Sequence, residues 1–295
     1  MNIAAVSYLN TAPLIQGLAA LQETTLLRAV PSKIAEMVQS GEADIGLASI
    51  IDYAQSQYSP TPLTLIPAGM IGCDGPTLTV RLFSSVPINE ISTVHADTDS
   101  HTSVALCKLI LKEVHNITPD FIDYDTREHF PPNNADDPTD SNSEPQTLLM
   151  IGDKVVTASP PAVRYPHQID LGQAWHDLTN LSFVYATWMC KSSDLSDPES
   201  KANIIATAHI LERTMLKNQT RIDWLVATHA KRTGWPTDLA QDYIGNLLRF
   251  KVDDRAKESV ATFLTKLADH DLLPEPVEPT WLNLATQEAP APAFT

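Results

Sequence analysis

The chain has 295 residues, of which 43% are hydrophobic, and this length and composition predict about two globular domains. Its formal net charge is −16, with 36 acidic against 20 basic residues, so it lacks the basic surface that nucleic acids and anionic membranes attract. No cationic leader and no run of about 20 apolar residues is present, and we therefore expect a cytoplasmic protein with no nucleic-acid or membrane partner.

The first predicted elements are a short strand, a polar turn and a helix. An apolar run over residues 1–6 is followed by the polar side chains Ser7, Asn10 and Thr11, and residues 13–22 then have apolar side chains at helical spacing. Such a strand-to-helix turn is where open α/β sheets bind ligands, because free backbone N–H groups and the helix dipole point there. The alternative is an ordinary capped helix, with Thr11 or Asn10 as its N-cap.

The next elements continue the alternation of strand and helix. A strand is predicted over 26–30, a helix capped by Ser32 and ended by Gly41 follows, and 43–48 is the next strand. The order β-α-β-α-β with short connections is typical of a parallel or mixed sheet covered by helices. The sequence therefore predicts an α/β fold.

Two further strands precede a predicted boundary. One is predicted over residues 63–66. The other covers residues 77–84, which alternate apolar and polar side chains, as a strand with two different faces would. Pro87 then marks the boundary between the two expected domains.

The opening arrangement is repeated after this boundary. A strand over 92–96 leads into a polar turn at 97–103 and then into a helix. Ser100, Thr102 and Ser103 gather where free N–H groups at the helix start could meet an anion. Plain capping by serine or threonine is the alternative.

The remainder of the chain changes character twice. Residues 125–146 are rich in Pro, Asn, Asp and Ser without an apolar period, and we expect a mobile acidic surface loop there. Strands are predicted over 147–151 and 183–189. Beyond residue 198 the pattern is helical, and the expected helices cover residues 199–217, 219–231, 237–248 and 254–270.

Several classes of chemistry have no support in the sequence. Only 10 glycines are present, and neither a dinucleotide-binding nor a phosphate-binding glycine motif occurs. The pattern Gly-x-Ser-x-Gly and the metal-binding pattern His-Glu-x-x-His are also absent. The cysteines are three, widely spaced and expected to be reduced. We expect no metal and no cofactor.

Acidic and small polar residues remain as candidates. Asp44, Asp52, Asp153 and Asp170 could act as acids or bases, but each is more simply a helix cap or a surface carboxylate. Hydroxyl and amide groups together with backbone N–H groups can hold a carboxylate without a basic cluster. A small acidic ligand in a cleft between two lobes is therefore predicted, with side chains at predicted strand ends around it: Ser7, Asn10, Thr11, Thr79, Ser100, Thr102 and Ser103.

Six ordered blocks of this sequence resemble the chorismate dehydratases of the futalosine route to menaquinone. The resemblance runs from residue 3 to about residue 272, and an ordered string of motifs is more specific than any one of them. The blocks are Ser7–Leu14, Gly41–Leu47, Ser100–Ser103, Ile151–Lys154, Ile169–Trp175 and Phe183–Trp188.

The resemblance implies a fold and a reaction. The fold would be that of type II periplasmic binding proteins, in which two α/β lobes joined by two crossovers hold the ligand in a cleft. The first lobe would comprise residues 1–91 and 187–295, and the second residues 92–186. The reaction would remove water from chorismate, the small-molecule substrate, to give 3-[(1-carboxyvinyl)oxy]benzoate.

The resemblance also implies roles for individual residues. Asn10 matches a family asparagine held near the substrate, and it would orient the departing hydroxyl group as a catalytic residue. Thr79, the second catalytic candidate, stands where the family usually has serine. The expected substrate-binding residues are Ser7, Thr11, Ser100, Thr102, Ser103 and Asp153.

The sequence departs from the family pattern at three places. His101 stands where arginine is common, residues 179–183 differ from the family's Thr-Gly-Leu-Pro-Phe, and an acidic insertion lies near 131–146. Two other functions stay open: a binding protein for a small carboxylate that performs no chemistry, and the sister lyase of the same pathway, which releases a dihydroxynaphthoate. The Ser7–Leu14 block favours the dehydratase.

Overall fold

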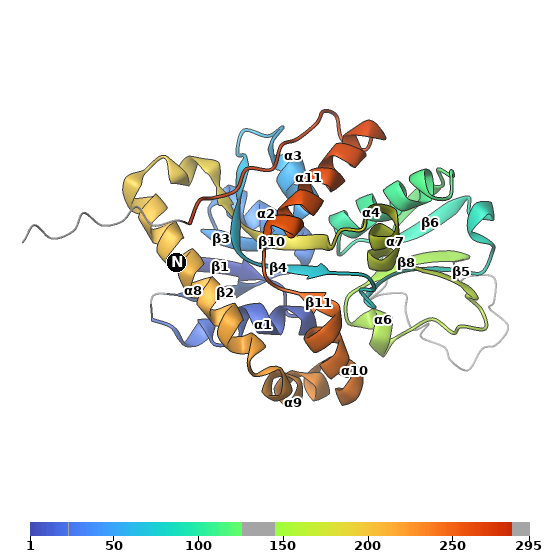
Figure 1. The fold of residues 1–295 in the computed structure, drawn as a ribbon, viewed down its shortest axis with the longest axis horizontal. Helices are drawn as coiled ribbons and strands as arrows, with labels where there is room; N and C mark the ends of the chain where they lie inside the picture. The colour runs from blue at the N-terminus through green and yellow to red at the C-terminus, as the bar shows by residue number, and fades with distance from the viewer. Residues whose placement is uncertain (23, 126–144, 285–295) are drawn as a thin grey trace, which may run out of the picture.

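Two β-sheets, each flanked by helices, form two lobes that lie side by side (Figure 1). The structure is a computed structural model, and it describes residues 1–22, 24–125 and 145–284. Most of the expected acidic loop, including nearly all of the insertion at 131–146, lies outside these described residues. None of the helices within the described ranges is long and apolar enough to cross a membrane.

The first lobe is built on a sheet with the spatial order β11-β4-β10-β3-β1-β2. Strand β1 pairs in parallel with β2 and β3, whereas β10 runs antiparallel to β3 and β4. Every residue of β3 is buried, as in a central strand covered on both faces. The strands are β1 (Asn2–Ala5), β2 (Thr25–Arg28), β3 (Ile45–Ser49), β4 (Leu63–Cys73), β10 (Phe183–Lys191) and β11 (Leu248–Arg249).

The second lobe is built on a smaller sheet with the order β7-β6-β8-β5-β9. Strand β6 is parallel to β7 and β8, and β5 is antiparallel to β8 and β9. The strands are β5 (Val80–Ser84), β6 (Thr93–Asp97), β7 (Asp120–Tyr124), β8 (Thr147–Ile151) and β9 (His167–Asp170).

The helices divide between the lobes in the same way (Figure 1). Those of the first lobe are α1 (Ala12–Ile15), α2 (Pro31–Ser40), α3 (Ile50–Ser56), α8 (Pro198–Gln219), α9 (Ile222–Thr233), α10 (Thr237–Asp242) and α11 (Asp254–Asp269). Those of the second are α4 (His101–Glu113), α6 (Lys154–Thr157) and α7 (Leu171–Thr179). Helix α11 packs on β10 and also reaches α4.

Two expected helices differ from the structure, and both lie near the cavity described below. The helix predicted over 13–22 is only α1, Ala12–Ile15, because Gly17 adopts a left-handed φ of +99° and a separate short turn follows. The helix predicted over 237–248 ends at Asp242 and continues as a π-helical turn, Tyr243–Leu247. Such turns widen a helix locally and re-aim its side chains.

The chain passes between the sheets twice. It leaves the first sheet after Cys73 and enters the second at Val80, and it returns between Thr179 and Phe183. The first crossing therefore comes earlier than the expected lobe limit at residue 91, because β5 pairs with β8 and β9 rather than with the first sheet. We propose that these two crossings, rather than residues 91 and 186, limit the lobes.

Candidate active site

A cavity of about 630 Å³, open at its mouth, lies between the two lobes. This volume is all of the empty space in the cavity and includes the open space at its mouth. Both lobes, the first crossing and the π-helical turn contribute to its wall. The lining residues are Val6, Tyr8, Asn10, Pro31, Leu47, Ser49, Ile71, Thr77, Thr79, Val80, Ser100, Ser103, Ile151, Gly152, Tyr185, Ala186, Tyr243 and Leu248.

The turn after β1 brings Asn10 into this cavity. Thr11 is fully buried, and its hydroxyl group donates to the carbonyl oxygens of Tyr8 (2.7 Å) and Val6 (3.1 Å), which ties the turn to the end of the strand. Leu9 is buried in the core beneath the turn. The Asn10 Oδ1 atom is buried and has no hydrogen-bond partner among the described residues. A buried acceptor without a partner is uncommon, and a bound ligand would satisfy it.

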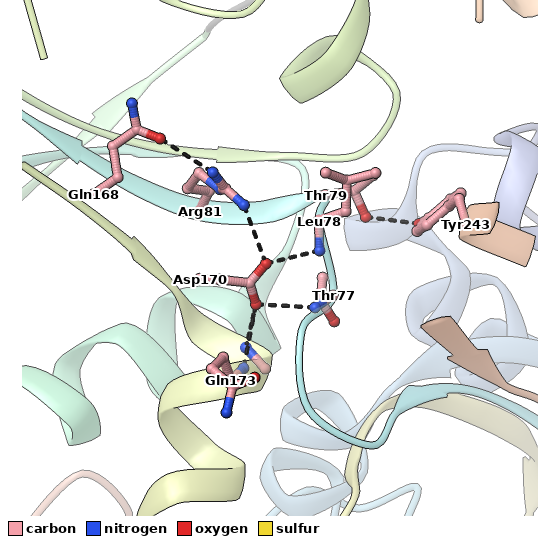
Figure 2. Close-up of polar contacts among 9 residues, drawn as sticks. Thr77, Leu78, Thr79, Arg81, Gln168, Asp170, Gln173 and Tyr243 are labelled. Atoms are coloured by element: carbon pink, nitrogen blue, oxygen red, sulfur yellow. Dashed lines mark hydrogen bonds and ion pairs between the residues drawn. The ribbon is translucent and has the colours of Figure 1, made fainter. Parts of the chain in front are cut away.

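Thr79 and Tyr243 form a hydrogen-bonded pair in the cavity wall. The Thr79 Oγ1 and Tyr243 hydroxyl oxygens are 2.6 Å apart, and both side chains are buried (Figure 2). The Tyr243 ring stacks on Trp235, with ring centroids 4.8 Å apart. Burial raises the pKa of Tyr243, and hydrogen bonds from Thr79 and Asn10 oppose this shift only in part. Tyr243 is therefore neutral at ordinary pH, and its hydroxyl group joins the two expected catalytic residues.

Ser100 and Ser103 line the opposite side, at the amino terminus of α4. Ser100 is the N-cap residue, and its Oγ atom accepts from Ser103 N at 3.2 Å and lies 3.0 Å from Ser103 Oγ. The helix dipole and the first N–H groups of α4 favour a negative charge at this position. Both serines are thus placed to bind a carboxylate.

None of the described residues that line the cavity is an Asp, Glu, His, Lys or Arg. Its titratable residues are three tyrosines, and burial raises the pKa of both Tyr185 and Tyr243. Two more polar atoms of the wall are buried, Thr77 Oγ1 and the Tyr185 hydroxyl oxygen. Like Asn10 Oδ1, neither makes a hydrogen bond of normal length and angle to any of the described residues. The groups that this wall offers to a polar ligand are therefore neutral.

Four expected binding residues lie outside the cavity wall. Ser7 is exposed, and the Thr11 hydroxyl is used within its own turn. Thr102 Oγ1 accepts from Ile51 N at 3.1 Å and so joins the two lobes. Asp153 accepts from Leu9 N at 3.3 Å. For Thr11, Thr102 and Asp153 the geometry supports an indirect role, in which they hold the backbone around the site.

Other contacts between the lobes also surround the site. The Tyr8 hydroxyl donates to Asp99 Oδ2 at 3.1 Å. His101 Nδ1 lies 2.6 Å from Asp52 Oδ1, and this hydrogen bond raises the pKa of His101. His101, which stands where the family resemblance leads one to expect arginine, is therefore directed to the first lobe and lies outside the cavity wall.

The burial of Asp153 predicts a stability that depends on pH. Burial raises its pKa from 3.8 to about 6, although hydrogen bonds from Leu9 and Trp235 oppose the shift. The folded protein therefore binds more protons than the unfolded chain between about pH 4 and 6, so this group's contribution to stability falls as the pH rises through that window. Asp153→Asn, which cannot ionise, is expected to raise the free energy of unfolding at pH 7 by about 2 kcal/mol.

Denaturant unfolding of both proteins from pH 4 to pH 7 measures this effect. The difference between the variant and the wild type should grow between about pH 4 and 6 and stay constant above that range. A difference that is the same at every pH would show that Asp153 does not titrate as its burial implies.

Sequence reasoning missed the aromatic part of the site. Tyr8, Tyr185 and Tyr243 line the cavity, but only Tyr8 lies in a stretch that was singled out for its polar turn. Tyr185 belongs to a strand that reads as plain core, and Tyr243 was placed on a regular helix. The π-helical turn that directs Tyr243 to Thr79 has no recognisable sequence signal.

Comparisons with known proteins agree with this arrangement. A family model described as menaquinone biosynthesis matches residues 1–269. A curated relative, the chorismate dehydratase of Thermus thermophilus, is 28% identical over 274 residues, which cover 88% of this chain and 92% of the relative.

Solved structures show the same fold at low sequence identity. A Candida albicans gene product with the generic periplasmic binding protein fold has a TM-score of 0.63 and 12% identity, covering 97% of this chain and 98% of that one. The periplasmic aliphatic sulphonate binding protein of Escherichia coli has a TM-score of 0.59 and 15% identity, covering 96% and 98%. At such identities the likeness shows the fold alone. It confirms the prediction of a two-lobed fold of the type II periplasmic binding protein kind.

Proposed function

The chain belongs to the menaquinone biosynthesis family, and from that premise we propose that it is a chorismate dehydratase that converts chorismate to 3-[(1-carboxyvinyl)oxy]benzoate. The observation that carries this proposal is the convergence of Asn10, Thr79 and Tyr243 on one cavity between the lobes. The enzyme is then a carbon–oxygen lyase. We further propose that it acts in the cytoplasm, on the futalosine route.

The reaction is an elimination of water from two neighbouring ring carbons of chorismate. The C–H bond beside the enolpyruvyl ether breaks, its electron pair forms a ring double bond, and the neighbouring C–O bond breaks. The proton that the ring carbon loses is passed on to the departing hydroxide, which leaves as water, and the ring becomes aromatic, which drives the step. Catalysis then requires orientation, exclusion of water and control of protons rather than a strong external base.

The neutral cavity wall suggests where the proton goes. Tyr185 and Tyr243 stay protonated at neutral pH, because burial raises the pKa of both, and no carboxylate or imidazole is found among the described residues that line the wall. We propose that the carboxylate of the substrate's own enolpyruvyl side chain takes the ring proton. The other carboxylate would bind at the amino terminus of α4, beside Ser100 and Ser103.

Three residues act at the departing hydroxyl group in this account. Asn10 presents an amide whose oxygen has no partner among the described residues, and it orients the hydroxyl group. Thr79 donates a hydrogen bond to the leaving oxygen and keeps its own proton. The Tyr243 hydroxyl lies 2.6 Å from Thr79 Oγ1, and either oxygen can donate in this contact. We propose that with substrate bound Tyr243 donates to Thr79, so that the Thr79 proton is directed to the substrate.

Incubation of the purified protein with chorismate tests the proposal. Mass spectrometry is expected to show a product lighter than chorismate by one water. Tight binding with no change in mass would instead support a binding protein for a small carboxylate. Release of a dihydroxynaphthoate from the substrate of the later pathway step would support the sister lyase.

A further inference from the structure

The backbone immediately before Thr79 adopts a conformation that a leucine avoids. Leu78 has a φ of +69°, in the left-handed region where the Cβ atom crowds the neighbouring backbone. Its neighbours Thr77 and Thr79 both line the cavity. Residues held in such conformations persist only when surrounding contacts fix them, and they concentrate at functional sites.

One carboxylate fixes this segment from the second lobe. Asp170 Oδ1 accepts from Thr77 N at 2.9 Å, and Asp170 Oδ2 accepts from Leu78 N at 2.7 Å (Figure 2). The Asp170 side chain is only 10% exposed, and Arg81 Nη2 lies 3.5 Å from Oδ2. A charged acceptor on two successive N–H groups holds the backbone strongly.

The same carboxylate caps helix α7. Asp170 Oδ1 also accepts from Gly172 N at 3.1 Å and from Gln173 N at 3.2 Å. Capping alone would need only these two N–H groups, and a serine would supply it equally well. The bonds to Thr77 and Leu78 come from a segment more than 90 residues away in sequence and are separate from the cap.

Close packing at Gly172 supports the same connection. A Cβ atom at Gly172 would lie 2.5 Å from Cys73 Sγ, 2.7 Å from the Gly75 carbonyl oxygen and 2.9 Å from Thr77 Oγ1. The start of α7 is therefore pressed against the first crossing. The hydrogen bonds of Asp170 and the packing of Gly172 together hold the first crossing against helix α7.

We propose that Asp170 is a positioning residue for the dehydration, which holds Leu78 in its left-handed conformation and thereby directs the Thr79 hydroxyl to Tyr243 and the cavity. The side chain of threonine is stiff at χ1, so its backbone decides where the hydroxyl lies. The observed 2.6 Å contact of Thr79 Oγ1 with the Tyr243 hydroxyl depends on this placement. The inference rests on the proposed function.

Asp170 accepts from Thr77 N and Leu78 N, which we call the clamp, and it also caps α7. Two substitutions separate these two roles. Asp170→Ser keeps an oxygen that can cap α7 but is too short to reach Thr77 and Leu78, and Asp170→Asn leaves an NH₂ group that cannot accept from Leu78. Each is expected to lower kcat about fivefold with KM changed less than about twofold. Asp177→Asn is the matched control on the same helix, because the Asp177 side chain is 68% exposed and bonds only to Gln173 and His176 among the contacts described. It should leave kcat unchanged.

A suppressor at Leu78 gives the sharpest test. Glycine adopts a positive φ without a penalty, so Leu78→Gly in the Asp170→Ser background should recover at least about threefold of the lost kcat. Leu78→Ala in the same background keeps the penalty and should recover nothing. Equal kcat values for the two double variants, or an unchanged kcat in both Asp170 variants, would overturn the proposal.

Two further measurements keep this test separate from that of the proposed function. Absence of turnover in the wild type counts against the dehydratase alone. Amide hydrogen exchange of residues 74–80 reads the clamp without any substrate, and Asp170→Ser should speed exchange there while Asp177→Asn does not. An exchange rate of residues 74–80 that is unchanged in Asp170→Ser would overturn the proposed clamp, whatever the activity of the variant. The same measurement can be made on a variant that is too unstable for kinetics.

Discussion

Asn10→Ala is expected to lower kcat for chorismate at least tenfold, about 1.4 kcal/mol in activation free energy, with the protein still folded. The substitution removes the buried Oδ1 acceptor that faces the cavity and the amide group next to Tyr243. In this account the amide acts on the hydroxyl group as it departs, so its loss should fall on kcat rather than on KM. Steady-state kinetics of both proteins measure the effect.

A matched control separates this role from general destabilisation. Asn203 lies exposed on α8, and Asn203→Ala should leave both kinetic constants unchanged. Thermal unfolding shows whether each variant is folded. A folded Asn10→Ala protein with the wild-type kcat would remove Asn10 from the mechanism.

Tyr243→Phe is expected to lower kcat about tenfold with little change in thermal stability. The phenylalanine ring keeps the stacking on Trp235, and only the hydroxyl group that joins Thr79 and Asn10 is lost. Thr79 can then direct its proton away from the substrate. Tyr53→Phe is the control, because the buried Tyr53 hydroxyl donates to Glu278 O (3.0 Å), away from the cavity, so its loss should lower the Tm but not kcat.

The pair of Tyr243 and Thr79 can be tested as a unit. If the two hydroxyl groups act together, the variant carrying both Tyr243→Phe and Thr79→Val should be little slower than the slower single variant. Independent roles would make the two losses in activation free energy add. An additive result would therefore mean that Tyr243 does not act through Thr79.

Local sequence signals located half of the site. The turn after β1 and the start of α4 were both found, because short polar runs between apolar periods are governed by nearby residues. The strand predicted over 147–151 matches β8, Thr147–Ile151, for the same reason. The expected polar residues Asn10, Thr79 and Ser100 lie around one cavity, although their elements are far apart in sequence.

The remaining features depend on contacts that no local pattern encodes. Tyr243, which is 164 residues from Thr79 in sequence, contacts it because a π-helical turn directs its side chain there. For Asp170 the sequence favours a helix cap or a surface carboxylate; in the structure it caps α7 and also accepts from Leu78 N, 92 residues away in sequence. Such long-range partners follow from the packing of whole elements.

The lobe to which a strand belongs also depends on contacts between distant segments. The pattern of residues 77–84 predicts a strand with two different faces, and β5 covers Val80–Ser84. Whether such a strand joins one sheet or the other depends on its pairing partners, and β8 and β9 come much later in the chain. A local signal such as Pro87 therefore does not show where the chain passes from one sheet to the other.

We propose that this protein dehydrates chorismate in the cavity between its lobes. Proton NMR of chorismate incubated with the purified protein tests it most directly, because the spectrum identifies the product as well as its formation. We predict that the cyclohexadiene signals are replaced in full by those of a substituted benzoate that keeps its enolpyruvyl group, and that Asn10→Ala slows the replacement at least tenfold. Chorismate that stays unchanged in the presence of folded protein would contradict the account.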